Sequence, residues 1–429
     1  MVTQKGRVMN PVSGKHRWEC VLFVLLLLVQ QNAFLSIPMF VTGFSNGEMR
    51  GVENLYNTVG VGLSLLIVAL IVTHERASLL RIAKQNPAVL AFMLIILLSI
   101  TWSLHPQITA RRAVGYVITL AIAALLPLRF GVDGMMKVLS ASFVVSALSS
   151  IAFVVAFPQY GIMHIADLEG CWQGVFSTKE LLGSVMAVAV FVETYNLLRS
   201  SFREWWRIGL LGLYATLLTF AGSITADCAA AFYLMGAVTY LIWRRWQWRG
   251  LVAAAMTAGV LPLAFLLFTR EPQAVLGLVG KDTTLTGRVF LWQEVVKLIG
   301  QKSVLGWGFR AMWQPGDTLT GSLDSYAGFE APGAHNAVLE VALGVGLIGV
   351  LAMAWNVLVA LRRGVACCLE GAGLLGWFTL LFVVGVAVSG ITNEVMGMNQ
   401  EIDWLVFNAL MIGCGIVLQM PASTARVHI

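Results

Sequence analysis

The stretch "GAHNAVLEVALGVGLIG", residues 333–349, joins two kinds of sequence that seldom meet. It starts with the pair His335 and Asn336 and continues as an almost unbroken apolar run. A run of roughly 17–25 apolar residues is long enough to cross the hydrocarbon core of a bilayer. The stretch therefore predicts a membrane-spanning helix with a titratable side chain at its entrance.

The composition of the whole chain indicates the same environment. Of its 429 residues, 58% are hydrophobic and 12% are charged, whereas roughly 25% charged is usual for soluble domains. Lipid offers no partner for backbone polar groups, and the apolar runs are continuous rather than alternating, so they predict helices. We expect an all-α polytopic membrane protein, one integral membrane domain over residues 1–429 with about twelve transmembrane helices. The expected spans are 20–40, 57–73, 87–104, 113–128, 138–157, 181–198, 208–223, 226–242, 250–268, 335–361, 370–388 and 402–420.

The positions of Lys and Arg predict the orientation of the bundle. Basic residues concentrate in cytoplasmic loops, and about 18 of the 28 fall before the first span, in alternate loops or at the C-terminal end. Both termini are therefore expected in the cytoplasm. The first span is too long for a signal peptide and lacks a small-residue cleavage site, so it is expected to remain as an anchor.

The net charge of +6 fits this topological signal and an attraction for membrane lipids, with no nucleic-acid partner expected. The strip "WRRWQWRG", residues 243–250, is read as an interfacial anchor. Of the six cysteines only Cys171 lies clearly in an outer loop, so neither a disulfide framework nor a metal cluster is expected.

Three segments on the expected outer side depart from a plain bundle. The segment 105–116 carries Arg111 and Arg112 against the positive-inside trend, and the segment 158–183 brings Lys179 to a helix entrance. The third, 269–334, is a large outer loop between the ninth and tenth spans. A connection of this length is expected to carry structure and function.

Part of the large loop, "TLTGRVFLWQEVVKLIGQ" at 284–301, predicts an amphipathic helix. Arg288 would lie in its first turn behind Thr286 and Gly287 as candidate caps, and Gly300 would end it. Such a helix lies on the outer membrane interface or covers the bundle.

The segment that follows, "SVLGWGFRAMWQPGD" at 303–317, is rich in Gly and Trp and contains Arg310. Its glycines would allow the backbone to approach a ligand closely. Trp307 and Trp313 offer flat surfaces that stack on sugar rings or anchor to lipid heads, and both interpretations stay open.

Basic side chains on the outer face need partners, because a cation near the bilayer is costly unless paired. The candidates are Arg111, Arg112, Lys179, Arg288, Arg310 and His335. Acids that could pair with them are Asp167, Glu169, Glu180, Asp227, Asp282, Asp317, Asp324 and Glu330. The alternative to such ion pairs and to lipid-head contact is a bound diphosphate, since the planar fork of Arg matches phosphate oxygens.

His335 has a possible chemical role in that setting. An imidazole with an ordinary pKa near 6.5 can take a proton from a hydroxyl. Asn336 and Glu340 are four residues apart and would share one helix face. A base, a polar positioning group and cations are the parts needed for glycosyl transfer from a sugar diphosphate. The alternative is an N-capping or interface histidine. The glycines that follow, Gly344, Gly346 and Gly349, are expected to serve close helix packing.

Other catalytic motifs are missing from the sequence. It contains no phosphate-binding loop, no two-histidine zinc motif, no nucleophile elbow and no Asp-x-Asp pattern. A metal-independent reaction without a cofactor is therefore expected.

Several motifs together resemble the O-antigen ligase and exopolysaccharide polymerase family. They are "TGRVFLW", "VLGWGFRAMW" and "AHNAVLEVALGVGLIG", in that order, and "WQGVFSTKELLGSVMA" at 172–187. The last is similar to a Gly-x-Phe-x-x-Lys-Asn-x-x-Gly stretch of the family, with Glu180 in the place of Asn. The specific similarity covers roughly residues 170–350.

The resemblance implies an inverting glycosyltransferase of the bacterial inner membrane. It would act without a metal at the periplasmic face, on a glycan linked to undecaprenyl diphosphate. Carried over by residue, Arg288 would hold the diphosphate and His335 would be the catalytic base. Lys179 would contact substrate, and Arg111, Arg112, Arg310, Asn336, Glu340 and Trp313 complete the expected substrate site.

The sequence departs from the family at one place. Many relatives, ligases especially, have a Ser-Arg pair where this chain has "AGSITADCAA", with Ser223 followed by Ile224 and Thr225. The second diphosphate arginine is thus missing there, and Arg111, Arg112 or Arg310 is expected to replace it. The motif variants are closer to the exopolysaccharide polymerase branch.

Three functions remain in competition. Polymerisation of exopolysaccharide or O-antigen repeat units leads, with a second lipid-linked glycan as acceptor and with possible polysaccharide-assembly partners. O-antigen ligation to the lipid A core uses the same chemistry. A transporter or flippase for lipid-linked sugars is disfavoured, because transporters commonly repeat broken helices in both halves and the His-Asn pair occurs only in the second half.

Overall fold

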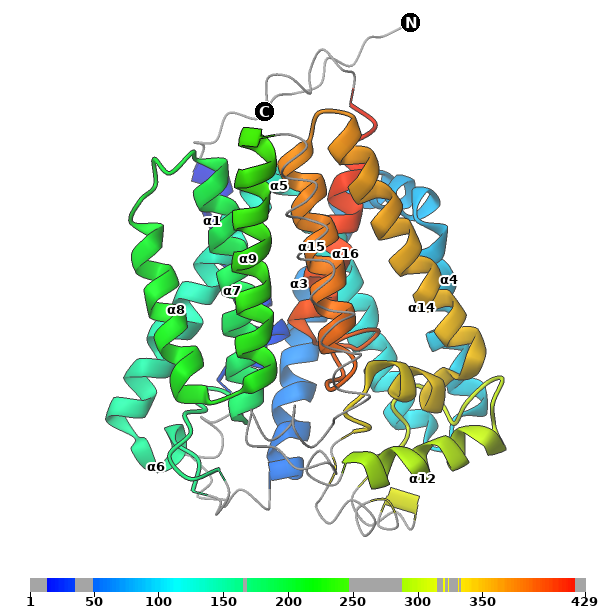
Figure 1. Ribbon diagram of the computed structural model, residues 1–429. Helices are drawn as coiled ribbons and strands as arrows, with labels where there is room; N and C mark the ends of the chain where they lie inside the picture. Colours follow the sequence, from blue (N-terminus) through cyan, green and yellow to red (C-terminus); the bar gives the residue numbers. More distant parts are fainter. Residues whose placement is uncertain are drawn as a thin grey trace, which may run out of the picture.

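The computed structural model describes residues 14–34, 49–164, 168–246, 288–314, 319–320, 323, 331 and 333–420. These residues form helices and no strand, apart from an isolated bridge between Ile162 and Trp172. The longer helices stand side by side as a bundle, and α12 lies across its lower end (Figure 1). The elements in chain order are α1 (Gly14–Gln30), α3 (Met49–Gln85), α4 (Pro87–Leu98), η2 (Ser99–Trp102), α5 (Pro106–Ala156), α6 (Pro158–Gly161), α7 (Lys179–Arg199), α8 (Arg207–Ala221), α9 (Ile224–Trp246), α12 (Arg288–Gln301), α14 (Ala337–Leu369), α15 (Gly373–Ser389) and α16 (Ile402–Val417).

The expected spans coincide with these helices. The span 250–268 and the end of the span 20–40 lie outside the described residues, and every other span overlaps a helix. The spans 113–128 and 138–157 share α5, whose helical geometry is interrupted at Gly131. In the described chain α5, α7, α9 and α14 are long and apolar enough to cross a membrane, and a bent pair in α3 could make a fifth. The chain is thus a multi-pass membrane protein, and the number twelve stays a prediction.

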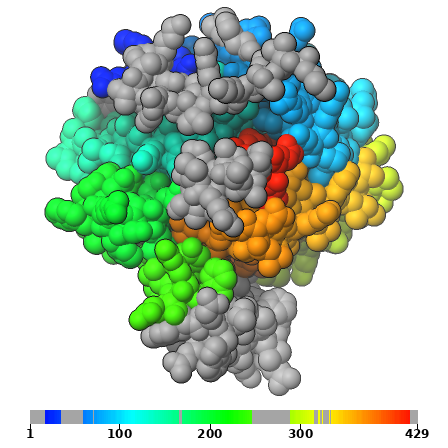
Figure 2. Space-filling model, turned by 90° about the horizontal axis from the view of Figure 1, so that it is seen from above, coloured from blue at the N-terminus to red at the C-terminus, as the bar shows by residue number. Residues whose placement is uncertain are grey.

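Helix α7 occupies the centre of the bundle. It packs against α5, α8, α9, α15 and α16, and nearly every side chain from Leu182 to Leu198 is buried. A helix that is apolar on all sides belongs in such a position, because it has no face suited to water. The final helix α16 is also enclosed, with all side chains from Ile402 to Cys414 buried. Seen from above, its red end lies among segments from the beginning, middle and end of the chain (Figure 2).

The end of the bundle at which α7 ends, called here the basic end, is held by ion pairs between helices. Arg129 bridges Glu19 and Glu75, from α1 and α3, at 2.6 and 2.5 Å. Arg199 pairs with Asp133 at 3.0 Å. The opposite end, where α6 and α12 lie in Figure 1, is called the site end.

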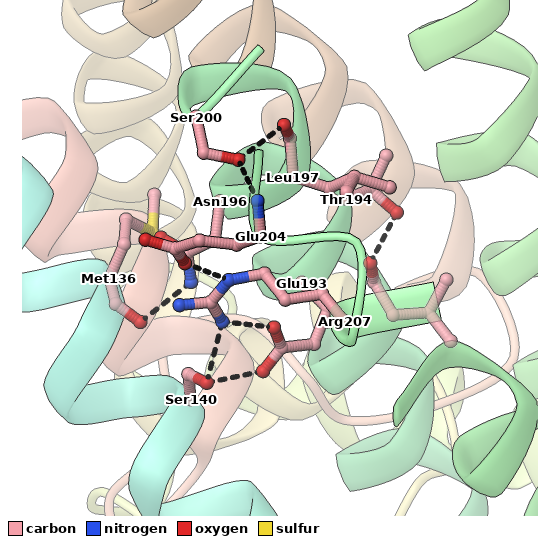
Figure 3. A network of polar contacts seen from close by, with 10 residues as sticks. Met136, Ser140, Glu193, Thr194, Asn196, Leu197, Ser200, Glu204 and Arg207 are labelled. Carbon is pink, nitrogen blue, oxygen red and sulfur yellow. Dashed lines mark hydrogen bonds and ion pairs between the residues drawn. The ribbon is translucent and has the colours of Figure 1, made fainter. Parts of the chain in front are cut away.

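The most enclosed of these contacts joins α7 to α8 (Figure 3). Arg207 Nη1 contacts Glu193 Oε2 at 2.5 Å, and its Nε donates to Glu204 Oε2 at 2.5 Å. Ser140 from α5 donates to the same Glu193 carboxylate. Glu193 is fully buried and Arg207 is 4% exposed, so neither charge can be solvated if its partner is removed.

We predict that Arg207→Met lowers the stability of the folded protein by about 3–5 kcal/mol, because it leaves the buried Glu193 charge unpaired. The double variant Glu193→Met, Arg207→Met should recover most of that loss, since both charges are then gone. Thermal unfolding of the purified protein in one detergent measures both effects. A single variant as stable as the wild type would contradict the expectation.

Candidate functional site

Helix α12 carries Arg288 at its first residue and seals part of the site end. Its inner face, Leu291, Val295 and Leu298, packs into a cluster with Met312, Trp313, Ala334 and Leu343. The predicted amphipathic helix is thus confirmed, and its apolar face covers the bundle. Two further apolar residues of α12, Val296 and Phe290, point outward and are 54% and 49% exposed. The candidate caps Thr286 and Gly287 lie outside the described residues.

A break in α14 makes room for the segment that precedes Arg310. Gly346 has φ of +67° inside the helix, so some carbonyl groups before it lose their helical partners. The segment supplies new donors: Trp307 N–H bonds to Leu343 O and Gly308 N–H to Gly344 O, each at 2.8 Å. This pairing fixes the backbone that leads into Arg310.

The glycines of these segments serve this packing. A Cβ at Gly306 would lie 2.6 Å from the Gly344 backbone, and one at Gly308 would lie 2.2 Å from Ser103 Oγ. They therefore approach the chain itself, whereas a ligand had been expected. Similarly, a Cβ at Gly346 would lie 2.1 Å from Val304 O, so this glycine packs against a loop and not, as expected, against another helix.

Glu340 holds the turn that carries His335 through hydrogen bonds. Its carboxylate accepts Trp313 Nε1–H at 3.0 and 3.1 Å and the Ala334 N–H at 3.0 Å. Trp313 and Glu340 are only 4% and 3% exposed. They support the turn from inside, and substrate contact by either remains a prediction. Trp307 is held similarly, by a bond from Nε1 to Leu298 O at 3.0 Å.

Asn336 ends the turn as the N-cap of α14. Its side-chain oxygen accepts the N–H groups of Val338 and Leu339 at 3.0 Å, and its amide donates to Ile391 O at 3.0 Å. Asn336 therefore takes the capping role that was the alternative for His335. His335 itself has φ of +48°, a conformation that is costly for a non-glycine residue and is concentrated at functional sites.

A short segment between α15 and α16, Thr392–Glu394, brings the cations and the histidine together. The carboxylate of Glu394 accepts the backbone N–H of His335 at 2.8 Å. One of its oxygens lies 3.7 Å from Arg310 Nη2. Thr392 O accepts Arg288 Nη1 at 2.8 Å. The contacts of Thr392 and Glu394 thus reach residues more than 50 positions away in the chain.

The remaining predicted residues lie around this segment or elsewhere. Arg112, in α5, donates from Nη1 to the Arg310 carbonyl, and Arg111 precedes it in the same helix. Lys179 makes its bond to Gly222 O at 3.1 Å. The roles predicted for Arg111 and Lys179 in substrate binding remain predictions.

Of the acids named from sequence, those among the described residues do not pair with the outer cations. In the described chain Glu169, Glu180 and Asp227 form no ion pair with them, and Asp167, Asp282, Asp317, Asp324 and Glu330 lie outside the described residues. Glu394 was missed by the sequence reasoning. Its signal is the acid-rich outer connection "TNEVMGMNQEID" at 392–403, which faces the basic outer segments.

The electrostatic setting favours a neutral imidazole. Burial lowers the pKa of His335, and Arg288 adds to this, while Glu394 and Glu180 oppose it. Burial also lowers the pKa of Arg288, against the opposing effect of Glu180 and Glu394. His335 can therefore accept a proton at neutral pH, while the two carboxylates favour the charged form of Arg288.

The described residues contain no group of three or more His, Cys, Asp or Glu side chains that could hold a metal ion. Metal independence stays a prediction. The fold and this cluster define a class: a multi-pass helical membrane protein with arginines and a histidine gathered at one end of the bundle.

Comparison with known proteins agrees with this class. Residues 209–354, which include Arg288, Arg310 and His335, match the family model described as O-antigen ligase. The chain is also 27% identical over 281 residues to the exopolysaccharide production protein ExoQ of Rhizobium meliloti (strain 1021). That match covers 61% of this chain and spans 61% of the length of the relative. The resemblance to the O-antigen ligase and exopolysaccharide polymerase family is thereby confirmed.

We predict that Gly346→Ala destabilises the protein by about 1–3 kcal/mol, because a side chain is strained at its positive φ and would meet the Val304 carbonyl. Gly300→Ala is the matched control, since Gly300 lies in α12 with nothing within 4 Å of an added Cβ. Thermal unfolding should separate the two variants. Equal stability of both would show that the break in α14 does not depend on glycine.

Proposed function

We propose that the protein is a metal-independent inverting glycosyltransferase of the bacterial inner membrane. It polymerises exopolysaccharide or O-antigen repeat units that are linked to undecaprenyl diphosphate, at the periplasmic face. The observation that carries this proposal is the convergence of His335, Arg288 and Arg310 on the segment Thr392–Glu394. A base beside two arginines suits a reaction in which a hydroxyl is activated and a diphosphate leaves.

The transfer step follows from these groups. His335 takes the proton of the acceptor hydroxyl, and the oxygen attacks the anomeric carbon of the donor sugar. The bond from that carbon to the diphosphate oxygen breaks, and its electron pair leaves with the lipid diphosphate. Arg288 and Arg310 stabilise the charge that develops on the diphosphate. A single displacement of this kind inverts the anomeric configuration.

Arg310 is our choice for the arginine that is missing after Ser223. Arg310 pairs with Glu394, whose carboxylate also accepts the backbone N–H of His335. Arg112 donates a hydrogen bond to the backbone carbonyl of Arg310. Arg112 therefore supports the position of Arg310, and the two arginines that bind the diphosphate would be Arg288 and Arg310.

The distribution of charge supports the periplasmic orientation. Four arginines form ion pairs or hydrogen bonds at the basic end, opposite the site: Arg129, Arg199, Arg207 and Arg363. Basic residues favour the cytoplasmic side. We therefore propose that α12 and His335 face the periplasm, with the start of α1 and the end of α16 on the cytoplasmic side.

Ligation is the second candidate, because the matched family model is described as O-antigen ligase. The acceptor would then be a lipid A core, and the base and the arginines would have the same roles. Polymerisation and ligation differ in the acceptor and not in the chemistry at His335.

We predict that His335→Ala lowers the transfer rate by at least about 100-fold, because it removes the general base. The loss should appear in a reconstituted assay of purified protein, with normal folding and membrane insertion. His164→Ala, at an exposed histidine near α6, is the control and should keep full activity. Normal product from His335→Ala would contradict the assignment of the base.

We predict that Arg288→Lys lowers activity about 10- to 100-fold, because lysine keeps the charge and loses the forked geometry. The same change at Arg362, at the basic end, should have no effect. Initial rates at saturating donor measure this difference. Full activity of Arg288→Lys would make Arg288 a structural residue.

The rate should fall with decreasing pH as His335 becomes protonated, and the midpoint should lie below about 6.5 because burial lowers the pKa of His335. Arg288 also lowers this pKa, so Arg288→Gln should move the midpoint of its residual activity to higher pH. Rates measured from pH 4.5 to 8 test both statements. A midpoint above 7 in the wild type would argue against His335 as the titrating base.

A further inference from the structure

A pocket opens at the site end between α7, α9, α15 and α16. Its empty volume, which includes space open to solvent, is about 320 Å³. Glu180 and Asn393 lie on its lining. Glu180 acts electrostatically on both His335 and Arg288, and Asn393 stands between Thr392 and Glu394. The pocket is therefore next to the proposed catalytic groups.

Most polar side chains that line the pocket lack partners within the described chain. Ser184 donates to Asp403 at 2.9 Å. The side chains of six further lining residues make no hydrogen bond or ion pair with any described residue: Glu180, Ser223, Thr225, Tyr233, Ser389 and Asn393. Glu180 is exposed, and Thr225, Ser389 and Asn393 are partly exposed, so these side chains are accessible from the pocket. A carboxylate, an amide and four hydroxyls are thus left available to a ligand.

The charge of the pocket selects the kind of ligand. Its charged lining residues are two acids, Glu180 and Asp403. They repel a diphosphate, whose binding falls to Arg288 and Arg310 beyond Thr392 and Glu394. Carboxylates and hydroxyls suit the many O–H groups of a sugar, and Ala187 and Val395 offer apolar contact to its C–H face.

We propose that this pocket binds a pyranose ring of the glycan and places it against His335. The inference deepens the proposed function and rests on it. The ring belongs either to the acceptor, whose hydroxyl His335 activates, or to the donor, whose diphosphate lies on the arginines. In both cases the site divides the substrate, with the uncharged ring in the acidic pocket and the anion on the cations.

Direct binding tests the pocket without the lipid. Saturation-transfer NMR on the purified protein in lipid would use methyl pyranosides of glucose, galactose, mannose and N-acetylglucosamine at millimolar concentration. At least one should bind, and Thr225→Val and Asn393→Ala should each weaken it about tenfold through lost hydrogen bonds. Thr216→Val, on the exposed side of α8, is the matched control. No binding of any pyranoside, or equal binding by all variants, overturns the proposal.

Transfer kinetics distinguish a failure of this sugar-binding proposal from a failure of the proposed glycosyltransferase function. If the wild type forms no product from a lipid-linked glycan, the proposed function fails whatever the sugar binding shows. If it forms product, Thr225→Val and Asn393→Ala should raise the KM for a lipid-free acceptor glycan or for the lipid-linked donor by about tenfold. The substrate whose KM rises identifies the ring in the pocket. An unchanged KM for both substrates would contradict the proposal that the pocket binds a ring of the glycan.

Discussion

The carboxylate of Glu394 is the contact on which the arrangement of the site depends. It receives the backbone N–H of His335 and faces the guanidinium of Arg310, so it joins the start of α14 to the loop after α12. Its position requires glycine at 333, because a Cβ there would lie 1.8 Å from Glu394 Oε1. Its negative charge among several cations limits their mutual repulsion.

The break in α14 shows how a membrane helix can admit a loop. Backbone polar groups inside a bilayer need partners within the protein. Here the carbonyls of Leu343 and Gly344 obtain them from Trp307 and Gly308, and Leu347 N–H bonds to Ser303 O. The loop that carries Arg310 is thereby bonded to α14 through its backbone. Catalytic side chains placed on such a frame stay aligned with little reorganisation, which is the condition for electrostatic stabilisation of a transition state.

The sequence predicted the helices better than the contacts between them. Apolar runs predicted the spans, because length and hydropathy are local properties, and the helical spacing of apolar residues within 284–301 predicted α12. The motif order placed Arg288 and His335 in one site, and the structure brings both to Thr392–Glu394. The His335–Glu394 and Trp313–Glu340 hydrogen bonds could not be predicted from sequence. Their partners lie 59 and 27 positions apart, and no periodicity relates them. The glycines near Trp307 were misread because the partner they approach, α14, is set by the tertiary fold.

This site is proposed to transfer a glycan from one lipid diphosphate to another sugar. The most direct measurement uses the purified protein in lipid with a synthetic undecaprenyl-diphosphate oligosaccharide, analysed on a gel with and without a lipid A core acceptor and with a chelator present. For a metal-independent polymerase we expect a ladder of products that needs no core and persists with the chelator. A single shift that depends on the core would replace polymerisation by ligation at the same site. If no product forms and the lipid-linked sugar instead crosses the bilayer, the protein is a transporter and the account of His335 is wrong.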